Sequence, residues 1–127
     1  MIDKIGAIII DSKKILIARE KGLDIFFIPG GKRKAGESDL DTLTREVREE
    51  LDVTVKSHKY YKTFFAKNHD GTDEVRVKAY FVDADDHPKP NSEIEELLWI
   101  NKENSHQYKL GNILKIMVPE LIKDEIL

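Results

Sequence analysis

The sequence of 127 residues contains no cysteine, which excludes disulfide bonds and thiolate metal sites and predicts a cytoplasmic location. Long apolar runs are also missing. Segments such as AIII at 7–10 fall far short of the roughly 20 residues that a membrane-spanning helix needs. The N-terminal segment has no basic region followed by a full apolar core and a small-residue cleavage site, so it does not predict a signal peptide. We therefore predict no membrane association.

An excess of positive charge is absent as well. The formal net charge is -3, so no basic surface predicts a nucleic-acid partner. The 40% hydrophobic and 35% charged residues are typical of a globular protein, and the length predicts one domain spanning residues 1–127. An anionic ligand would therefore have to be met by local basic residues or by a cation.

β-Branched and apolar segments predict most of the strands. Residues 4–10 and 14–18 flank the turn-forming sequence DSKK and predict a β-hairpin. A short strand over 25–28 runs into Pro29-Gly30-Gly31. Because proline lacks a backbone donor and the glycines are free to turn, we expect the chain to leave the sheet there.

The second half of the chain shows the same strand patterns and one helix. The expected elements are strands over 53–66 and 74–84 with a turn at Asp70-Gly71, a loop over 85–92, a strand before residue 100, and a helix over 113–126 that contains or starts at Pro119.

The best-defined helix begins after Ser38, which is a favourable N-cap, with Asp41 as the partner acid of a capping box. The apolar spacing predicts one buried stripe, formed by Leu40, Leu43, Val47 and Leu51. At about 100° per residue, three carboxylates then share one flank, turned away from the stripe: Glu46, Glu49 and Glu50.

Two interpretations of this carboxylate flank are open. It can be a solvated helix face on which Arg45 and Arg48 relieve the repulsion. Alternatively, it can be a site for a hard divalent cation such as Mg²⁺, which prefers oxygen ligands. The glycine-rich turn directly before the helix favours the second interpretation, because it supplies backbone groups near the same flank.

Residues 31–53 resemble the Nudix box, G-x5-E-x7-R-E-U-x-E-E-x-G-U, in which U is aliphatic. The matching positions are Gly31, Glu37, Arg45, Glu46, Val47, Glu49, Glu50 and Val53. The one departure is Asp52, which stands where the family has a glycine that ends the helix in a left-handed conformation. Because aspartate tolerates that conformation, we expect the replacement to reduce local stability and leave the chemistry intact.

The resemblance implies an α/β fold, a Nudix-type α/β/α sandwich with a mixed central β-sheet. It also implies hydrolysis of a nucleoside diphosphate linked to another moiety. The short chain favours a nucleoside triphosphate, oxidised ones included, converted to the monophosphate and pyrophosphate. Nucleotide sugars, ADP-ribose, dinucleoside polyphosphates and capped RNA remain alternatives, and small family members are commonly homodimers.

Two other classes of function are open. One is a non-catalytic nucleotide sensor with the Nudix fold. The complete set of box glutamates argues against it, because a protein that only binds nucleotide does not need a crowded metal site. The other is a structural domain with a chance match to the box, which would not respond to divalent cations.

The resemblance also implies site residues. Mg²⁺ or Mn²⁺ would be held by the carbonyl of Gly30 and by Glu46, Glu49 and Glu50. The last two glutamates are then also catalytic, and Arg45, with Glu37, fixes the direction of the carboxylates.

The remaining roles lie outside the helix. A general base in this family often precedes a strand that carries an aromatic residue, which favours Glu93, with Glu96 as the second candidate. Substrate phosphates are assigned to Lys32 and Arg19, because arginine and lysine bind phosphate oxygens.

Overall fold

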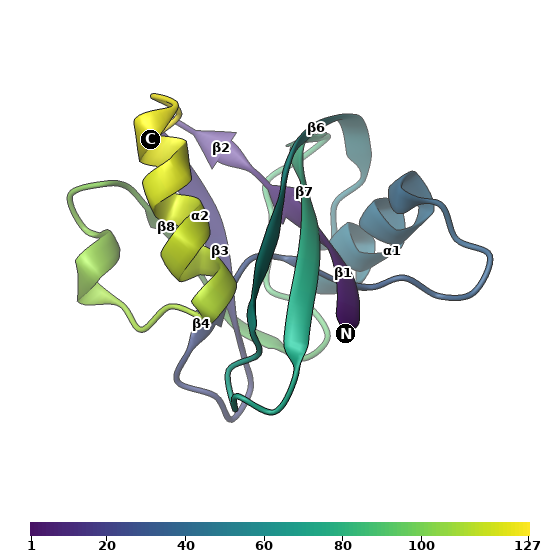
Figure 1. Cartoon of the computed structure of the whole chain (residues 1–127). Helices are drawn as coiled ribbons and strands as arrows, with labels where there is room; N and C mark the ends of the chain where they lie inside the picture. Colours follow the sequence, from purple (N-terminus) through teal and green to yellow (C-terminus); the bar gives the residue numbers. More distant parts are fainter.

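The computed structural model describes all 127 residues and contains two four-stranded β-sheets and two α-helices (Figure 1). The elements are β1 (Ile2–Ile8), β2 (Ile10–Asp11), β3 (Lys14–Glu20), β4 (Phe26–Phe27), β5 (Gly30–Lys32), α1 (Asp39–Leu51), β6 (Val55–Lys67), β7 (Glu74–Ala84), β8 (Ile94–Ile100), a 3₁₀ turn (Ser105–Gln107) and α2 (Asn112–Lys123). No helix is long and apolar enough to cross a membrane.

The first sheet has the order β5-β1-β7-β6 and is mixed, because β1 runs parallel to β7 while the other neighbours are antiparallel. In the second sheet β3 lies between β2 and β4 and also pairs with β8. The predicted strands at 53–66 and 74–84 are confirmed as β6 and β7, and Gly71 adopts φ 74° in the turn between them.

Two hydrophobic clusters place the helices on opposite sides of the sheets (Figure 1). Leu43, Val47 and Leu51 of α1 pack in a cluster with Ile5 and Ala7 of β1. The other cluster joins α2, through residues such as Met117 and Leu121, to the opposite face of β1 and to β3 and β8. The predicted α/β/α sandwich with a mixed central sheet is therefore confirmed.

The start of α1 has the predicted capping box. The hydroxyl of Ser38 accepts a hydrogen bond from the backbone N–H of Asp41 at 3.1 Å, and the carboxylate of Asp41 accepts one from the N–H of Ser38 at 3.1 Å. The prediction for Leu40 was wrong, since its side chain is exposed. The buried position of this turn is Thr42, whose hydroxyl donates to Glu37 Oε1 at 3.1 Å and so draws the preceding loop over it.

One strand prediction needs correction. Residues 4–10 and 14–18 do not form a simple hairpin, because β1 pairs with β5 and β7 and only the short β2 pairs with β3. The hydrophobic pattern cannot distinguish these partners, since each offers β1 a similar surface. The chain leaves the second sheet after β4, as expected, but Gly30 and Gly31 then enter β5 of the first sheet, opposite Gly6 and Ile5.

The closing helix is confirmed in part. α2 spans Asn112–Lys123 and therefore begins and ends earlier than 113–126, with Pro119 inside it. The segment before residue 100 is the predicted strand, β8.

Asp52 ends α1 in the left-handed conformation, with φ 55° and ψ 38°, as expected for the position of the family's glycine. We expect Asp52→Gly to raise the free energy of unfolding by about 0.5–1 kcal/mol. The reason is that glycine relieves the backbone strain and the aspartate charge opposes the helix dipole. Thermal melting checks this, and Asp52→Asn separates the two causes because it removes only the charge. A lower melting temperature for Asp52→Gly would contradict the argument.

Candidate active site

The buried carboxylate of the box is Glu50, only 6% exposed although it was predicted to face away from the apolar stripe. It faces β5, where the backbone N–H of Gly30 donates to its Oε1 at 2.8 Å. Burial raises the pKa of Glu50 from its ordinary 4.5 to about 8, the Gly30 hydrogen bond opposes the rise, and the negative charges of Glu46, Glu93 and Glu20 add to it. The side chain therefore has a strong affinity for a proton or another positive charge.

Glu46 lies against the backbone of the glycine turn. A Cβ atom on Gly31 would lie 2.5 Å from the Glu46 carboxylate, so any other residue there would displace this carboxylate. Burial raises the pKa of Glu46, although the hydrogen bond from Arg45 at 2.8 Å lowers it. Glu49 is about half exposed and lies 3.6 Å from the guanidinium of Arg45.

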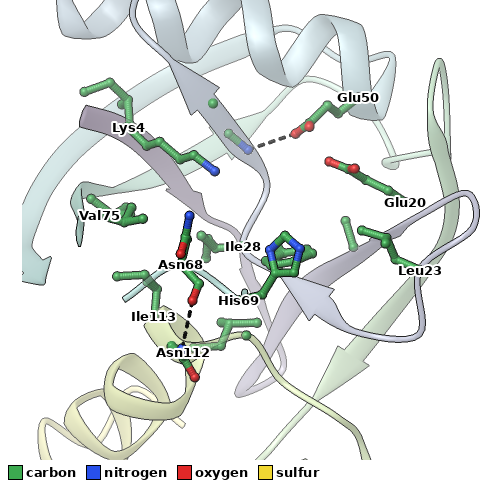
Figure 2. A pocket seen from close by; sticks show the side chains of 18 of the residues that line it. Lys4, Glu20, Leu23, Ile28, Glu50, Asn68, His69, Val75, Asn112 and Ile113 are labelled. Atoms are coloured by element: carbon green, nitrogen blue, oxygen red, sulfur yellow. Dashed lines mark hydrogen bonds between the residues drawn. The ribbon is translucent and has the colours of Figure 1, made fainter. Parts of the chain in front are cut away.

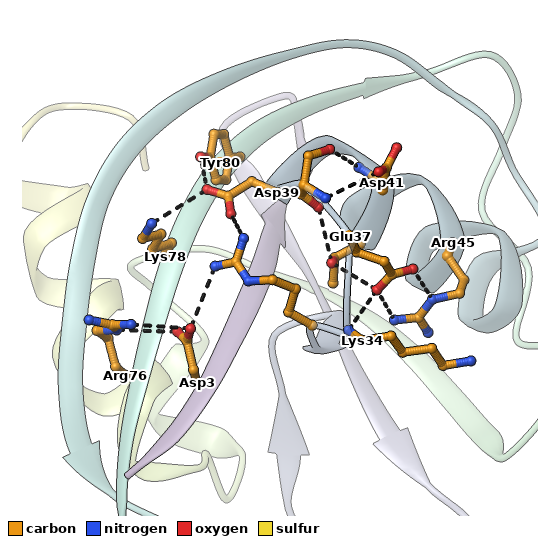
Figure 3. A network of polar contacts seen from close by, with 12 residues as sticks. Asp3, Lys34, Glu37, Asp39, Asp41, Arg45, Arg76, Lys78 and Tyr80 are labelled. Atoms are coloured by element: carbon orange, nitrogen blue, oxygen red, sulfur yellow. Dashed lines mark hydrogen bonds and ion pairs between the residues drawn. The ribbon is translucent and has the colours of Figure 1, made fainter.

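Arg45 connects the carboxylates to the loop before the helix (Figure 3). Its Nε and Nη2 donate to the two carboxylate oxygens of Glu37 at 2.7 and 2.8 Å. Its Nη2 also donates to the carbonyl of Lys32 at 3.1 Å, while Nη1 binds Glu46. This one guanidinium therefore holds the loop, the end of β5 and a box carboxylate in a fixed relation.

The contact with Arg45 lowers the pKa of Glu37 from its ordinary 4.5 to about 2. A carboxyl whose pKa is lower in the folded state stabilises the fold above its unfolded pKa, and this contribution is lost as the pH falls through the folded pKa. We therefore expect Glu37→Gln to reduce the free energy of unfolding at pH 7, and the difference from wild type to vanish between about pH 5 and pH 2. Denaturant titrations at pH 7, 4 and 3 measure it. Glu95→Gln, an exposed change without side-chain contacts, should show no such pH dependence, and a pH-independent Glu37 effect would contradict the assignment.

A second ionic network fixes the same loop to the first sheet (Figure 3). Arg33 pairs with Asp39 at the start of α1, and with Asp3 of β1 at 3.5 Å. Asp3 also binds Arg76 of β7 at 3.1 Å, and the hydroxyl of Tyr80 donates to Asp39. Both ends of the loop over residues 33–38 are therefore held by charged contacts.

The oxygen atoms of the site are of the kind that divalent cations bind. The oxygens of Glu46 and Glu50 adjoin the backbone of Gly30-Gly31, and hard cations bind carboxylates and carbonyls. No three acidic or histidine side chains stand close enough together to hold a metal ion in the present arrangement. Binding would therefore have to draw Glu46, Glu49 and Glu50 together from their contacts with Arg45 and Gly30.

A cavity of about 290 Å³ is lined by one of these carboxylates, Glu50 (Figure 2). Its lining at the box end includes Glu20, Gly30, Gly31 and Glu50, and its far end includes Phe27, His69, Asn112 and Ile113. The rings of Phe27 and His69 meet edge to face with centroids 5.7 Å apart. The cavity therefore joins a carboxylate-rich end to an aromatic and apolar end.

The site residues that were predicted outside the helix have different surroundings in the structure. The negative charge of Glu93 contributes to the raised pKa of both Glu46 and Glu50, although Glu93 does not line the cavity, whereas Glu96 is paired with Arg19 at 3.1 Å. Arg19 also donates to the carbonyl of Leu23 at 2.9 Å and does not line the cavity. Lys32 is exposed at the end of β5, two residues from Gly30.

Sequence reasoning missed several cavity residues, chiefly Lys4, Glu20 and Asn112. The carboxylate of Glu20 lies on the same side of the cavity as Glu50 (Figure 2). Side chains alternate along a strand, so Glu20 lies on the same face of β3 as Ala18, which also lines the cavity. Glu20 was missed because the predicted strand ended at residue 18.

Comparisons with known proteins identify the family of the chain and its fold. The family model described as NUDIX domain matches residues 2–121. The E. coli ORF135 protein, solved in solution, is 29% identical with a TM-score of 0.77, and the match covers 98% of this chain and 89% of that one. No curated protein sequence matches the chain.

Two further structures share the fold. A MutT NUDIX hydrolase from Burkholderia pseudomallei is 18% identical with a TM-score of 0.83, covering 94% of this chain and 97% of that one. The NUDIX domain of Shewanella oneidensis NrtR, crystallised with ADP ribose, is 15% identical with a TM-score of 0.77, covering 100% and 89%. The chain belongs to the Nudix family and is a Nudix hydrolase.

Proposed function

We propose that the chain hydrolyses a nucleoside triphosphate, oxidised ones included, to the monophosphate and pyrophosphate, and that it uses Mg²⁺ or Mn²⁺. The observation that carries the proposal is the cavity of about 290 Å³, which extends from Glu50 to the rings of Phe27 and His69. Its volume is near the lower end of the roughly 300–1,000 Å³ of ligand pockets. We place the base at the aromatic end, which directs the phosphates toward Glu50.

The cation would be held by Glu46, Glu49, Glu50 and the carbonyl of Gly30. When bound, it would neutralise phosphate charge and lower the pKa of a water molecule. Arg45 holds Glu46 in position, and Lys32 is the residue we assign to a substrate phosphate. Arg19 is withdrawn from that role, since its charge is matched by Glu96.

Glu93 is the base that we propose. The hydroxyl of Ser92 donates to it at 2.6 Å, and this hydrogen bond lowers the pKa of Glu93, so the side chain is a charged proton acceptor at neutral pH. The pairing of Glu96 with Arg19, together with the effect of the Glu93 charge on Glu46 and Glu50, favours Glu93 over Glu96. The homodimer and the cytoplasmic location stay predictions.

The test is a substrate panel with Mg²⁺. The purified protein is incubated with nucleoside triphosphates, a nucleotide sugar, ADP-ribose and a dinucleoside polyphosphate, and the release of pyrophosphate and phosphate is measured. Pyrophosphate from triphosphates, absent in Glu50→Gln, is the expected result. Turnover of another class alone would replace the substrate, and nucleotide binding without any turnover would favour a sensor.

A further inference from the structure

One charged side chain of the cavity has no partner within the chain. Lys4 of β1 is partly buried and points its ammonium group into the cavity (Figure 2). It forms no ion pair and no side-chain hydrogen bond, whereas Lys67, the other lysine of the lining, lies 3.5 Å from Glu74. The direction of Lys4 follows from strand alternation, because its neighbour Ile5 packs with α1 on the opposite face.

The strand neighbours of Lys4 offer its ammonium group no acceptor side chain. Val75 and Val77 of β7 line the same cavity, and Val77 is the direct cross-strand neighbour of Lys4. On its other side, Lys4 is directly opposite Lys32 of β5, and like charges at opposed positions repel. Acceptor atoms of a bound molecule would give this ammonium group the partner that the chain does not supply.

The side-chain amides of the lining already donate within the chain. The amide nitrogen of Asn112 donates to the carbonyls of Lys67 and Asn68 at 3.1 and 3.3 Å, and one N–H of the Asn68 amide donates to the hydroxyl of Thr72 at 3.2 Å. His69 in its neutral form offers one donor and one acceptor, so it does not select between them. Lys4 offers three donors and no acceptor, and it therefore selects for acceptors.

The nucleobases differ in the acceptors that they present. Guanine has adjacent O6 and N7 acceptors, and the pyrimidines have carbonyl oxygens. Adenine keeps N7 but has no carbonyl, and it presents an amino donor in place of O6. We propose that Lys4 is a specificity residue that selects nucleotides whose base carries a ring carbonyl, guanine and the pyrimidines, over adenine. This inference rests on the proposed function, because it assumes that the base occupies the cavity.

The experiment measures kcat and KM for GTP, CTP and ATP in the wild type and in Lys4→Met, which keeps the length of the side chain and removes its donors. Wild type should favour GTP and CTP over ATP by about 5- to 100-fold in kcat/KM. Lys4→Met should raise KM for GTP and CTP by a similar factor, with kcat and all values for ATP unchanged. Lys67→Met, the matched control, should keep the wild-type selectivity.

Binding of GMP, CMP and AMP to the metal-free protein, followed by calorimetry, separates the two proposals. If no triphosphate is turned over, the proposed function fails, while a preference for GMP and CMP that disappears in Lys4→Met still supports the role of Lys4. Equal turnover or binding of the adenine nucleotide in wild type would overturn the inference. So would a Lys4→Met variant that weakens all three nucleotides equally.

Discussion

Glu50→Gln is expected to lower hydrolysis by about 1,000-fold, equivalent to about 4 kcal/mol of transition-state stabilisation, and at the same time to stabilise the metal-free protein. The loss of activity follows from the proposed role of Glu50 in holding the cation. The gain in stability follows from its burial, because an amide can accept the Gly30 hydrogen bond without carrying a charge.

The sign and the pH window of the stability effect follow from the pKa of Glu50, which is raised from 4.5 to about 8. A carboxyl with a raised folded pKa binds its proton more tightly when folded, so stability falls as the pH rises from about 4.5 to about 8. Relative to wild type, Glu50→Gln should gain about 3 kcal/mol at pH 7 and nothing below pH 4.

Thermal melting with and without Mg²⁺ measures this effect. Mg²⁺ should raise the melting temperature of wild type and leave that of Glu50→Gln unchanged, because a ligand stabilises only the state that binds it. Glu103→Gln, at an exposed position in the loop after β8, is the control and should behave as wild type. A Glu50→Gln protein that melts at a lower temperature without metal would contradict the account of its burial.

Gly30→Ala is expected to unfold the protein or to lower its free energy of unfolding by more than about 3 kcal/mol. Gly30 adopts φ 142°, which alanine rarely adopts, and a Cβ atom there would lie 2.0 Å from the carbonyl oxygen of Ile5. Neither backbone can move aside without breaking the pairing of β5 with β1. Denaturant unfolding of the purified variant, or its failure to accumulate as folded protein, gives the result.

Gly36→Ala is the matched control for Gly30→Ala. Gly36 also has a positive φ, 82°, but a Cβ atom there would meet nothing within 4 Å. Its replacement should therefore cost only the backbone strain, about 1 kcal/mol. Equal effects of the two substitutions would show that strain, and not the contact with Ile5, governs Gly30.

The residues of the box could be predicted from the sequence because their relations are local. Spacing along one helix places Glu46, Glu49 and Glu50 together, and the capping residues fix where that helix starts. The burial of Glu50 could not be predicted in this way, because it depends on β5 lying against α1. Nothing in the sequence around Gly30 states that the chain enters the other sheet there.

The cavity was beyond sequence reasoning for a related reason. Its lining comes from strands that lie far apart in the sequence, such as Lys4 of β1, Glu20 of β3 and Val77 of β7. Which face of each strand meets the cavity depends on strand pairing and register. A hydrophobic pattern does not specify the partner, which is why β1 was assigned to the wrong neighbour.

The pairing of β1 also bears on the order in which the chain folds. Ile2 pairs with Val75, and Ile15 of β3 pairs with Ile100 of β8, so both sheets are completed by contacts between distant segments. β6 and β7 instead form a local hairpin across a short turn. Closing a long loop costs more entropy and is slower, so the hairpin should form early and the two distant pairings late. Strands from both of these distant pairings line the cavity. The cavity therefore forms only after both pairings have formed.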